Sequence, residues 1–81
     1  MNLSGILVVT APGRFDECLA AVAALPAVEV FHRDPATHRF VVVQEADGID
    51  DEMAGLLRLK AVPGVALAEM VYHYFPEGEP Q

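Results

Sequence analysis

The chain has 81 residues, 53% of them hydrophobic, and its five Lys and Arg against twelve Asp and Glu give a formal net charge of −7. This length supports one modest hydrophobic core, and no apolar run reaches the roughly 20 residues that span a bilayer, so we expect no stable membrane insertion. The negative charge repels nucleic acid and anionic membranes, which excludes nucleic acid as a partner and favours a basic one.

The first part of the chain predicts a strand, a helix and a second strand. Residues 3–10 (LSGILVVT) are apolar and rich in β-branched side chains. No basic region precedes this run, which predicts a cytoplasmic protein without a signal peptide. Between residues 14 and 25 apolar side chains recur at three- and four-residue steps, the period of an amphipathic helix. Pro26 ends that helix, and residues 28–32 (VEVFH) predict the next strand.

A hairpin leads into the strand at the centre of the fold. The turn residues Asp34-Pro35-Ala36-Thr37 predict a reversal of the chain into a strand at residues 38–46. At its centre, residues 40–43 (FVVV) place apolar side chains on both faces of the sheet. Such a strand is typical of the middle of a sheet, with apolar partners above and below it.

A second helix and a last strand complete the order. Asp50 or Asp51 is the expected N-cap of a helix that runs to Lys60. Residues 65–75 predict a strand, and the polar residues 76–81 predict a disordered tail. The apolar residues that we expect on the inner face of the second helix are Ile49, Met53, Leu56 and Leu57.

This order consists of two successive β-α-β units, with Leu25-Pro26 and Val62-Pro63 at equivalent places between helix and strand. It predicts an α+β, ferredoxin-like βαββαβ domain over residues 1–75, a four-stranded antiparallel sheet with two helices on one face. Right-handed crossovers place both helices on the same side and the first and third strands in the centre. The other face of the sheet has no element left to cover it.

Polar residues at the strand ends indicate which side chains lie on that uncovered face. Side chains alternate between the two faces of a strand, so Ser4 and Thr10 point to one face of the first strand. In the same way Arg39 and Glu45 point to one face of the third strand. We assign the face that carries these polar residues to the open face and the opposite face to the core. The predicted open face has an apolar centre with an acidic rim: Ile6, Val8, Phe31, Val41, Val43, Leu67 and Val71, with Glu29, Glu45 and Glu69. The predicted core positions include Gly5, Leu7, Val9, Phe40 and Val42.

An apolar patch of roughly a few hundred Å² usually marks a contact site. Two occupants fit it equally well on physical grounds: a partner with an apolar stretch, or a second copy in a homodimer. No catalytic arrangement, cofactor motif or metal-ligand spacing is visible, so we expect neither an enzyme nor a metalloprotein. Cys18 is the only cysteine and falls on the inner stripe of the first helix, which predicts a buried, inert thiol.

Four segments together resemble the NapD family, small cytoplasmic chaperones of the periplasmic nitrate reductase. The resemblance spans about residues 4–73, and its most specific parts are Pro-x-Val-Glu-Val and the terminal Gly-Val-x-x-x-x-x-Val-Tyr-His. Ala27 departs from a family preference for Gly, and Gln44 interrupts a run that the family keeps apolar. The segments that carry the resemblance are Ser4–Thr10 (SGILVVT), Leu25–Val30 (LPAVEV), Arg39–Ala46 (RFVVVQEA) and Val62–His73 (VPGVALAEMVYH).

The resemblance implies a protein that binds the twin-arginine signal peptide of the molybdenum-containing catalytic subunit of a periplasmic nitrate reductase. Binding delays export of the precursor until its cofactor is inserted, with the chaperone as a monomer or weak dimer. Two adjacent guanidinium groups followed by an apolar stretch match an apolar sheet face with a carboxylate rim. The alternative from the residues is an ACT-like regulatory domain that binds a small effector through a sheet-mediated dimer.

Overall fold

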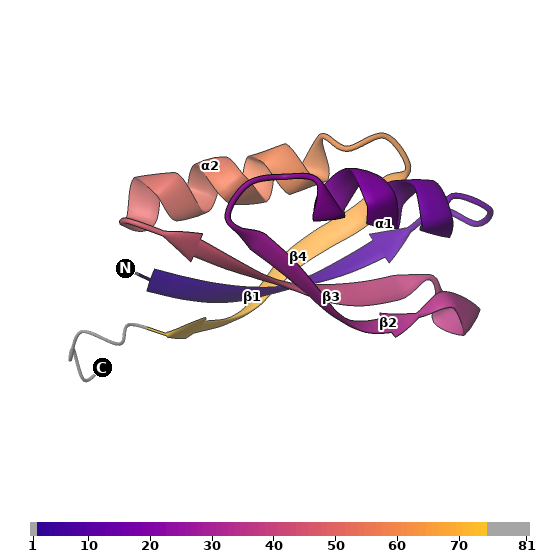
Figure 1. The fold of residues 1–81 in the computed structure, drawn as a ribbon, viewed down its shortest axis with the longest axis horizontal. Helices are drawn as coiled ribbons and strands as arrows, with labels where there is room; N and C mark the ends of the chain where they lie inside the picture. The colour runs from indigo at the N-terminus through magenta and orange to yellow at the C-terminus, as the bar shows by residue number, and fades with distance from the viewer. Residues whose placement is uncertain (1, 75–81) are drawn as a thin grey trace.

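The computed structural model describes residues 2–74, which alternate strands and helices as βαββαβ (Figure 1). A 3₁₀ turn, η1 (Pro35–Thr37), joins the second and third strands. The predicted tail and the end of the last predicted strand, residues 75–81, lie outside the described residues. The regular elements are β1 (Asn2–Thr10), α1 (Phe15–Ala23), β2 (Val28–Asp34), β3 (Arg39–Ala46), α2 (Ile49–Lys60) and β4 (Val65–Tyr74).

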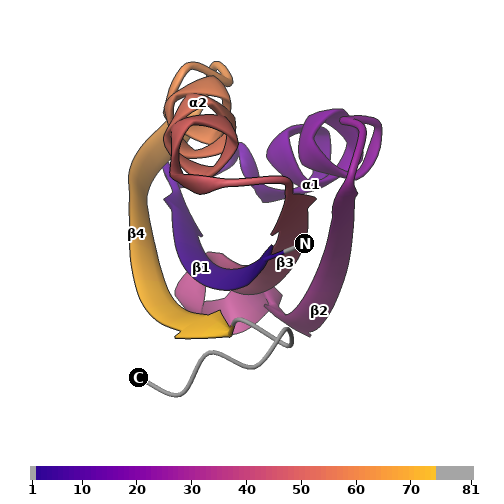
Figure 2. The same ribbon diagram turned by 90° about the vertical axis from the view of Figure 1, so that its left-hand side faces the viewer.

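The described strands form one antiparallel sheet in the order β2-β3-β1-β4, so β1 and β3 are central as predicted. Both helices lie on the same side of this sheet, which curves around them (Figure 2). The outer, convex face is therefore left uncovered by any described element. This arrangement is the ferredoxin-like fold expected from the sequence. No helix among residues 2–74 is long and apolar enough to cross a bilayer.

The core lies between the concave face of the sheet and the two helices. Phe40 of β3 is 1% exposed and meets Phe15 of α1 edge to face, with ring centroids 5.9 Å apart. Ile6 and Val8 of β1 and Val42 of β3 are fully buried beside them. These side chains come from the two central strands, so the core is continuous across the middle of the sheet.

Helix α2 presents a different face to the core from the predicted one. Leu56 is buried as expected, but Ile49, Met53 and Leu57 are 55%, 47% and 63% exposed, so the prediction for these three is wrong. A close approach to the sheet explains the difference, because a Cβ on Gly55 would clash with the side chain of Gln44. The inner face of α2 is instead formed by Glu52, Gly55, Leu56 and Leu59.

Gln44, the polar residue in the apolar run of β3, is 3% exposed and is accommodated by this helix. Its Nε2 donates a hydrogen bond to the backbone oxygen of Glu52, 3.1 Å away. The amide of Gln44 thus fixes the first turns of α2 on the sheet.

The prediction of Asp50 or Asp51 as the N-cap of α2 is wrong. The helix begins at Ile49, and the extended Gly48 precedes it without a side-chain cap.

The connection from α1 to β2 contains a left-handed residue. Ala27 has φ of 63°, a conformation that Ala adopts at a cost and Gly adopts freely. Its carbonyl oxygen accepts a hydrogen bond from the backbone N–H of Glu45 at 2.9 Å, which ties this loop to the end of β3. Ala27 is therefore a strained position in this loop.

We expect Ala27→Gly to stabilise the fold by about 1 kcal/mol, because it removes the left-handed strain of a residue with a Cβ. Chemical denaturation measures this as a higher midpoint at unchanged slope. The matched control is Ala24→Gly at the end of α1, where φ is −84°. That change gains nothing in conformation and should lower stability by up to about 1 kcal/mol. Equal effects of the two substitutions would contradict this interpretation.

Candidate functional site

The convex face of the sheet is a continuous surface made by all four described strands. Residues that pair directly across strands share a face, so the register assigns each side chain. Leu7 pairs with Val41 on one side and Glu69 on the other, and these three lie on the convex face. We call this surface the open face: Leu3, Gly5, Leu7 and Val9 of β1, Arg39, Val41, Val43 and Glu45 of β3, Glu29 and Phe31 of β2, and Leu67, Glu69, Tyr72 and Tyr74 of β4.

The placement of Ile6 and Val8 on the open face is wrong. Both side chains are 0% exposed and belong to the core beneath the helices. Gly5, Leu7 and Val9, which were predicted as core, lie on the open face instead. The two faces of β1 are therefore the reverse of the prediction, whereas the two faces of β3 are as predicted.

Two buried polar residues explain this reversal. Ser4 and Thr10 are 0% and 2% exposed, although their polarity suggested the uncovered face. Thr10 Oγ1 lies 3.4 Å from the backbone oxygen of His38, a partner in the hairpin that the sequence does not reveal. The predicted strand at residues 3–10 is apolar on both faces apart from these two hydroxyl residues, and small hydroxyl side chains are tolerated in a core.

The remaining predicted residues are accessible. Phe31, Leu67 and Val71 are 39%, 44% and 54% exposed. Val41 and Val43 are half-buried in the centre of the sheet. The carboxylates are exposed at its edges and ends: Glu29 of β2, Glu45 of β3 and Glu69 of β4. Val71 stands at a shift of register between β4 and β1, so it does not belong to the regular pairing.

Two of the three carboxylates share one corner of the open face. Glu29 pairs with Val43, and Glu45 is two positions further along β3, so the two acids are diagonal neighbours. A cavity of about 370 Å³ is lined by both, together with Leu3, Phe31 and Val43. We call this the acidic corner. Glu69 is on β4, at the opposite edge of the sheet.

Tyr72 and Tyr74 occupy the same end of the open face as the acidic corner. They pair with Gly5 and Leu3 of β1 and are 49% and 55% exposed. A Cβ on Gly5 would clash with the Tyr72 ring, so this ring covers the backbone of β1 at Gly5. Simple alternation from Leu67 and Glu69 along β4 would place Tyr72 on the core side of the sheet. The register shift at Val71 reverses the alternation beyond it, so Tyr72 lies on the open face. A glycine in a central strand was the signal available in the sequence.

Both the sequence and the fold of this chain match known proteins. The family model described as "NapD protein" matches residues 1–77. The chain belongs to the NapD family. The solution structure of the E. coli Tat proofreading chaperone protein NapD superposes with a TM-score of 0.81 at 24% identity, covering 98% of this chain and 84% of that one. No curated protein matches the chain in the corresponding sequence comparison.

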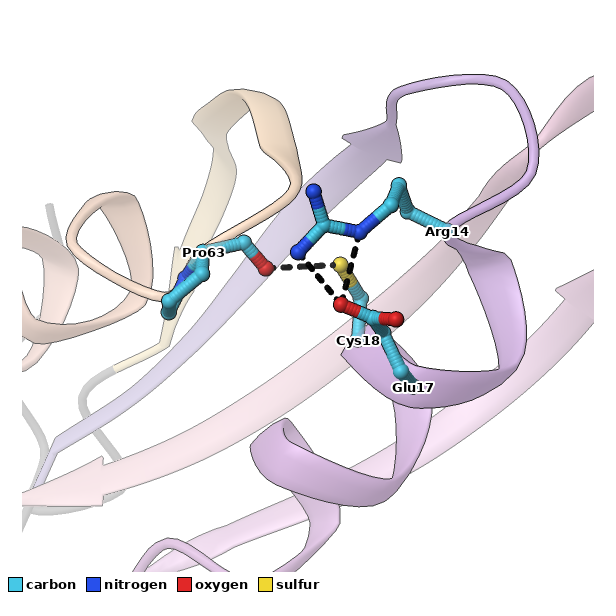
Figure 3. A network of polar contacts seen from close by, with 4 residues as sticks. All are labelled: Arg14, Glu17, Cys18 and Pro63. Carbon is cyan, nitrogen blue, oxygen red and sulfur yellow. Dashed lines mark hydrogen bonds and ion pairs between the residues drawn. The ribbon is translucent and has the colours of Figure 1, made fainter.

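On the helix side of this NapD family member, Cys18 is fully buried, as predicted, and its Sγ lies 3.2 Å from the backbone oxygen of Pro63 (Figure 3). Burial raises the pKa of the Cys18 thiol, and the nearby Arg14 opposes this shift. Arg14 is paired with Glu17, which raises the pKa of the guanidinium. A buried, hydrogen-bonded thiol with a raised pKa is a weak nucleophile, and the contact of Cys18 with Pro63 connects α1 to the α2–β4 loop.

A second polar contact connects β4 to α2. Glu52 is 1% exposed, and its Oε1 lies 2.9 Å from Nε2 of His73. His73 pairs with Ser4 across the strands, so its side chain turns toward the helices, opposite to the predicted parity. A buried carboxylate requires such a partner. This contact fixes the end of β4, the segment that presents Tyr72 and Tyr74.

The larger cavity of the NapD-like fold, about 600 Å³, lies beside the start of α2 and reaches the acidic corner through Glu45. Asp47, Asp51 and Arg58 are its charged lining residues besides Glu45. No group of three His, Cys, Asp or Glu residues within 2–74 is arranged to hold a metal ion. Three of the four charged residues that line this cavity are acidic, so the cavity extends the negative charge of the acidic corner around the end of the sheet.

Adjacent valines in β1 test the assignment of the two faces. Val8→Asp buries an unpaired charge under the helices, which costs several kcal/mol and should unfold a domain of this size. Val9→Asp, the matched control, places the same carboxylate on the open face and should cost only about 1 kcal/mol. Circular dichroism with chemical denaturation separates the two. A folded Val8→Asp variant beside an unfolded Val9→Asp variant would restore the parity predicted from sequence.

Proposed function

We propose that this NapD family member is a chaperone that binds the twin-arginine signal peptide of a periplasmic nitrate reductase precursor on its open face. Binding in the cytoplasm delays export until the molybdenum cofactor has been inserted into the precursor. The chaperone acts as a monomer or weak dimer and catalyses no reaction. Membership of the NapD family supports this proposal, as does the description of the solved homologue as a Tat proofreading chaperone.

The observation that carries the proposal is an apolar sheet face with paired carboxylates at one corner and no described element covering it. Leu7, Val41 and Phe31 form a row across its centre. Burial of apolar surface contributes about 25 cal/mol per Å², so the apolar stretch of a signal peptide supplies most of the affinity. The Val residues of the central strands lie on a rigid scaffold, which reduces the ordering cost of binding.

The carboxylates supply orientation. A twin-arginine motif presents two planar guanidinium groups, each able to form paired hydrogen bonds with a carboxylate. Glu29 and Glu45 are close enough to one another to contact adjacent arginines, whereas Glu69 stands alone at the other edge. A sheet-to-sheet homodimer would cover the same apolar surface, and it differs in having no requirement for arginine.

Substitutions in the centre of the open face should abolish peptide binding while the fold persists. We expect Val41→Asp and Val43→Asp to lose detectable binding of a synthetic twin-arginine peptide, because the new carboxylate must be desolvated unpaired in the complex. Val43→Thr, which is close in shape, is the matched control and should retain most of the affinity. Calorimetric titration measures binding and circular dichroism verifies folding. Wild-type affinity in a folded Val43→Asp variant would place the peptide elsewhere.

Neutralising the acidic corner should weaken binding in proportion to the lost charge-assisted hydrogen bonds. Glu29→Gln and Glu45→Gln should each cost about 1 to 3 kcal/mol, or about five- to a hundredfold in affinity. Glu69→Gln is the control at the opposite edge and should change affinity less. If all three variants bind as wild type does, arginine recognition by these carboxylates is wrong. A native mass that rises with protein concentration, with no response to peptide, would favour the homodimer.

A further inference from the structure

Charge is distributed unevenly along the strands. The acidic corner, with Asp47 and Asp51 beside it, lies at the end where α2 starts and β4 finishes (Figure 1, left). The opposite end contains the β1–α1 loop, the hairpin and the α2–β4 loop, which meet through backbone hydrogen bonds from Thr10 to His38 and from Ala11 to Gly64. The basic residues at or near that end are Arg14, which is paired with Glu17, and Arg33, Arg39 and Lys60, whereas Arg58 lines the cavity at the acidic end.

The side chains of the open face change in the same direction. The row nearest the acidic end runs across the sheet as Glu45, Leu3 and Tyr74, and the next as Glu29, Val43, Gly5 and Tyr72. Aromatic rings and carboxylates therefore share these two rows. The far rows are mainly aliphatic: Val41 and Leu7, then Val9 and Leu67, between Phe31 and Glu69 at the edges and with Arg39 and its partner Asp34 in the last row.

We propose that this gradient fixes the direction of the bound peptide, with its arginine pair over the acidic corner and the two tyrosines, and its apolar stretch running toward Val9 and Leu67. This inference rests on the proposed function and deepens it, because it names Tyr72 and Tyr74 as residues that contact the arginines. A peptide bound in the reverse direction would place its two cations beside Arg39 and leave the carboxylates unpaired.

The tyrosines suit this role by position and by chemistry. The Tyr72 ring covers Gly5 while the residue stays 49% exposed, so part of the ring is accessible to a cation above the sheet. One guanidinium of the pair stacks on a tyrosine ring, and the other reaches toward Glu45, which lies two strands from Tyr74 in the same row. Arg39 is held at the other end by a 3.1 Å hydrogen bond from its Nε to Thr37 Oγ1. In the far row the charge of Arg39 is opposed by Asp34, its partner across the strands, so the acidic corner is the end that attracts a guanidinium more strongly.

The length of the face fits this arrangement. From Leu3 to Val9 the strand advances about 20 Å at roughly 3.4 Å per residue. A helix of about 13 residues has this length at about 1.5 Å per residue. A short helical segment that begins with the arginine pair therefore spans the open face from the acidic corner to the apolar end.

Paramagnetic labelling tests the direction. A twin-arginine peptide carries a nitroxide at either its N-terminal or its C-terminal end, and each is added to ¹⁵N-labelled protein. The N-terminal label should broaden the amide signals of Leu3, Glu45 and Tyr74, and the C-terminal label those of Val9 and Leu67. The reverse pattern, or equal broadening of both ends by both labels, would overturn the proposed direction while leaving binding itself intact. Absence of any binding in calorimetry would overturn the proposed function as well.

Substitution of the tyrosines tests their contact with the arginines. Tyr72→Leu and Tyr74→Leu should weaken binding of the twin-arginine peptide about two- to fivefold, the range for an exposed cation–π contact. Tyr72→Phe keeps the ring and should restore wild-type affinity. A peptide with both arginines replaced by Gln should bind these variants and the wild type equally. A loss that persists with the Gln peptide would show that the tyrosines only pack against it and would overturn their assigned role.

Discussion

The two helices of this fold cover the same face of the sheet, and this constraint determines the rest of the structure. In each β-α-β unit the helix crosses over the sheet between the two strands, and the right-handed sense usual for such crossovers accounts for α1 and α2 both packing on the concave side (Figure 2). Phe40, Ile6 and Val8 fill the space beneath them. The chain has no further described element for the convex side, although Val41 and Leu7 make that side apolar as well. The uncovered surface is thus a consequence of the topology.

Residues 2–74 expose apolar side chains on two surfaces, and the elements that carry these surfaces distinguish them. Helix α2 exposes Ile49, Met53 and Leu57 in a single stripe. Carboxylates border both surfaces, since Ile49 shares a cavity with Asp47, Asp50 and Asp51. The open face joins Glu29 and Glu45 to a row of apolar side chains that crosses the sheet. It is also the surface that four strands hold rigid, and rigid surfaces lose less entropy on binding.

The sequence predicted the order of elements, the central strands and the face assignment of β3, since Arg39 and Glu45 at its two ends share one face. It did not predict the face of β1, because its polar residues Ser4 and Thr10 are buried, and Thr10 contacts the hairpin at His38, far along the chain. The rotation of α2 depends on the approach of Gly55 to Gln44, and the position of Tyr72 depends on a register shift at Val71. Periodicity carries no information about such long-range contacts.

Side-chain methyl signals give the most direct test of where the peptide binds. The methyl groups of Leu3, Leu7, Val9, Val41 and Val43 lie on the open face, those of Ile6, Val8 and Val42 in the core, and those of Ile49, Met53 and Leu57 on the exposed stripe of α2. Addition of a twin-arginine peptide to methyl-labelled protein should shift and broaden the first set, with contacts from peptide to protein protons confined to it. Direct contacts to the α2 stripe, with the open-face methyl groups unchanged, would contradict binding on the sheet.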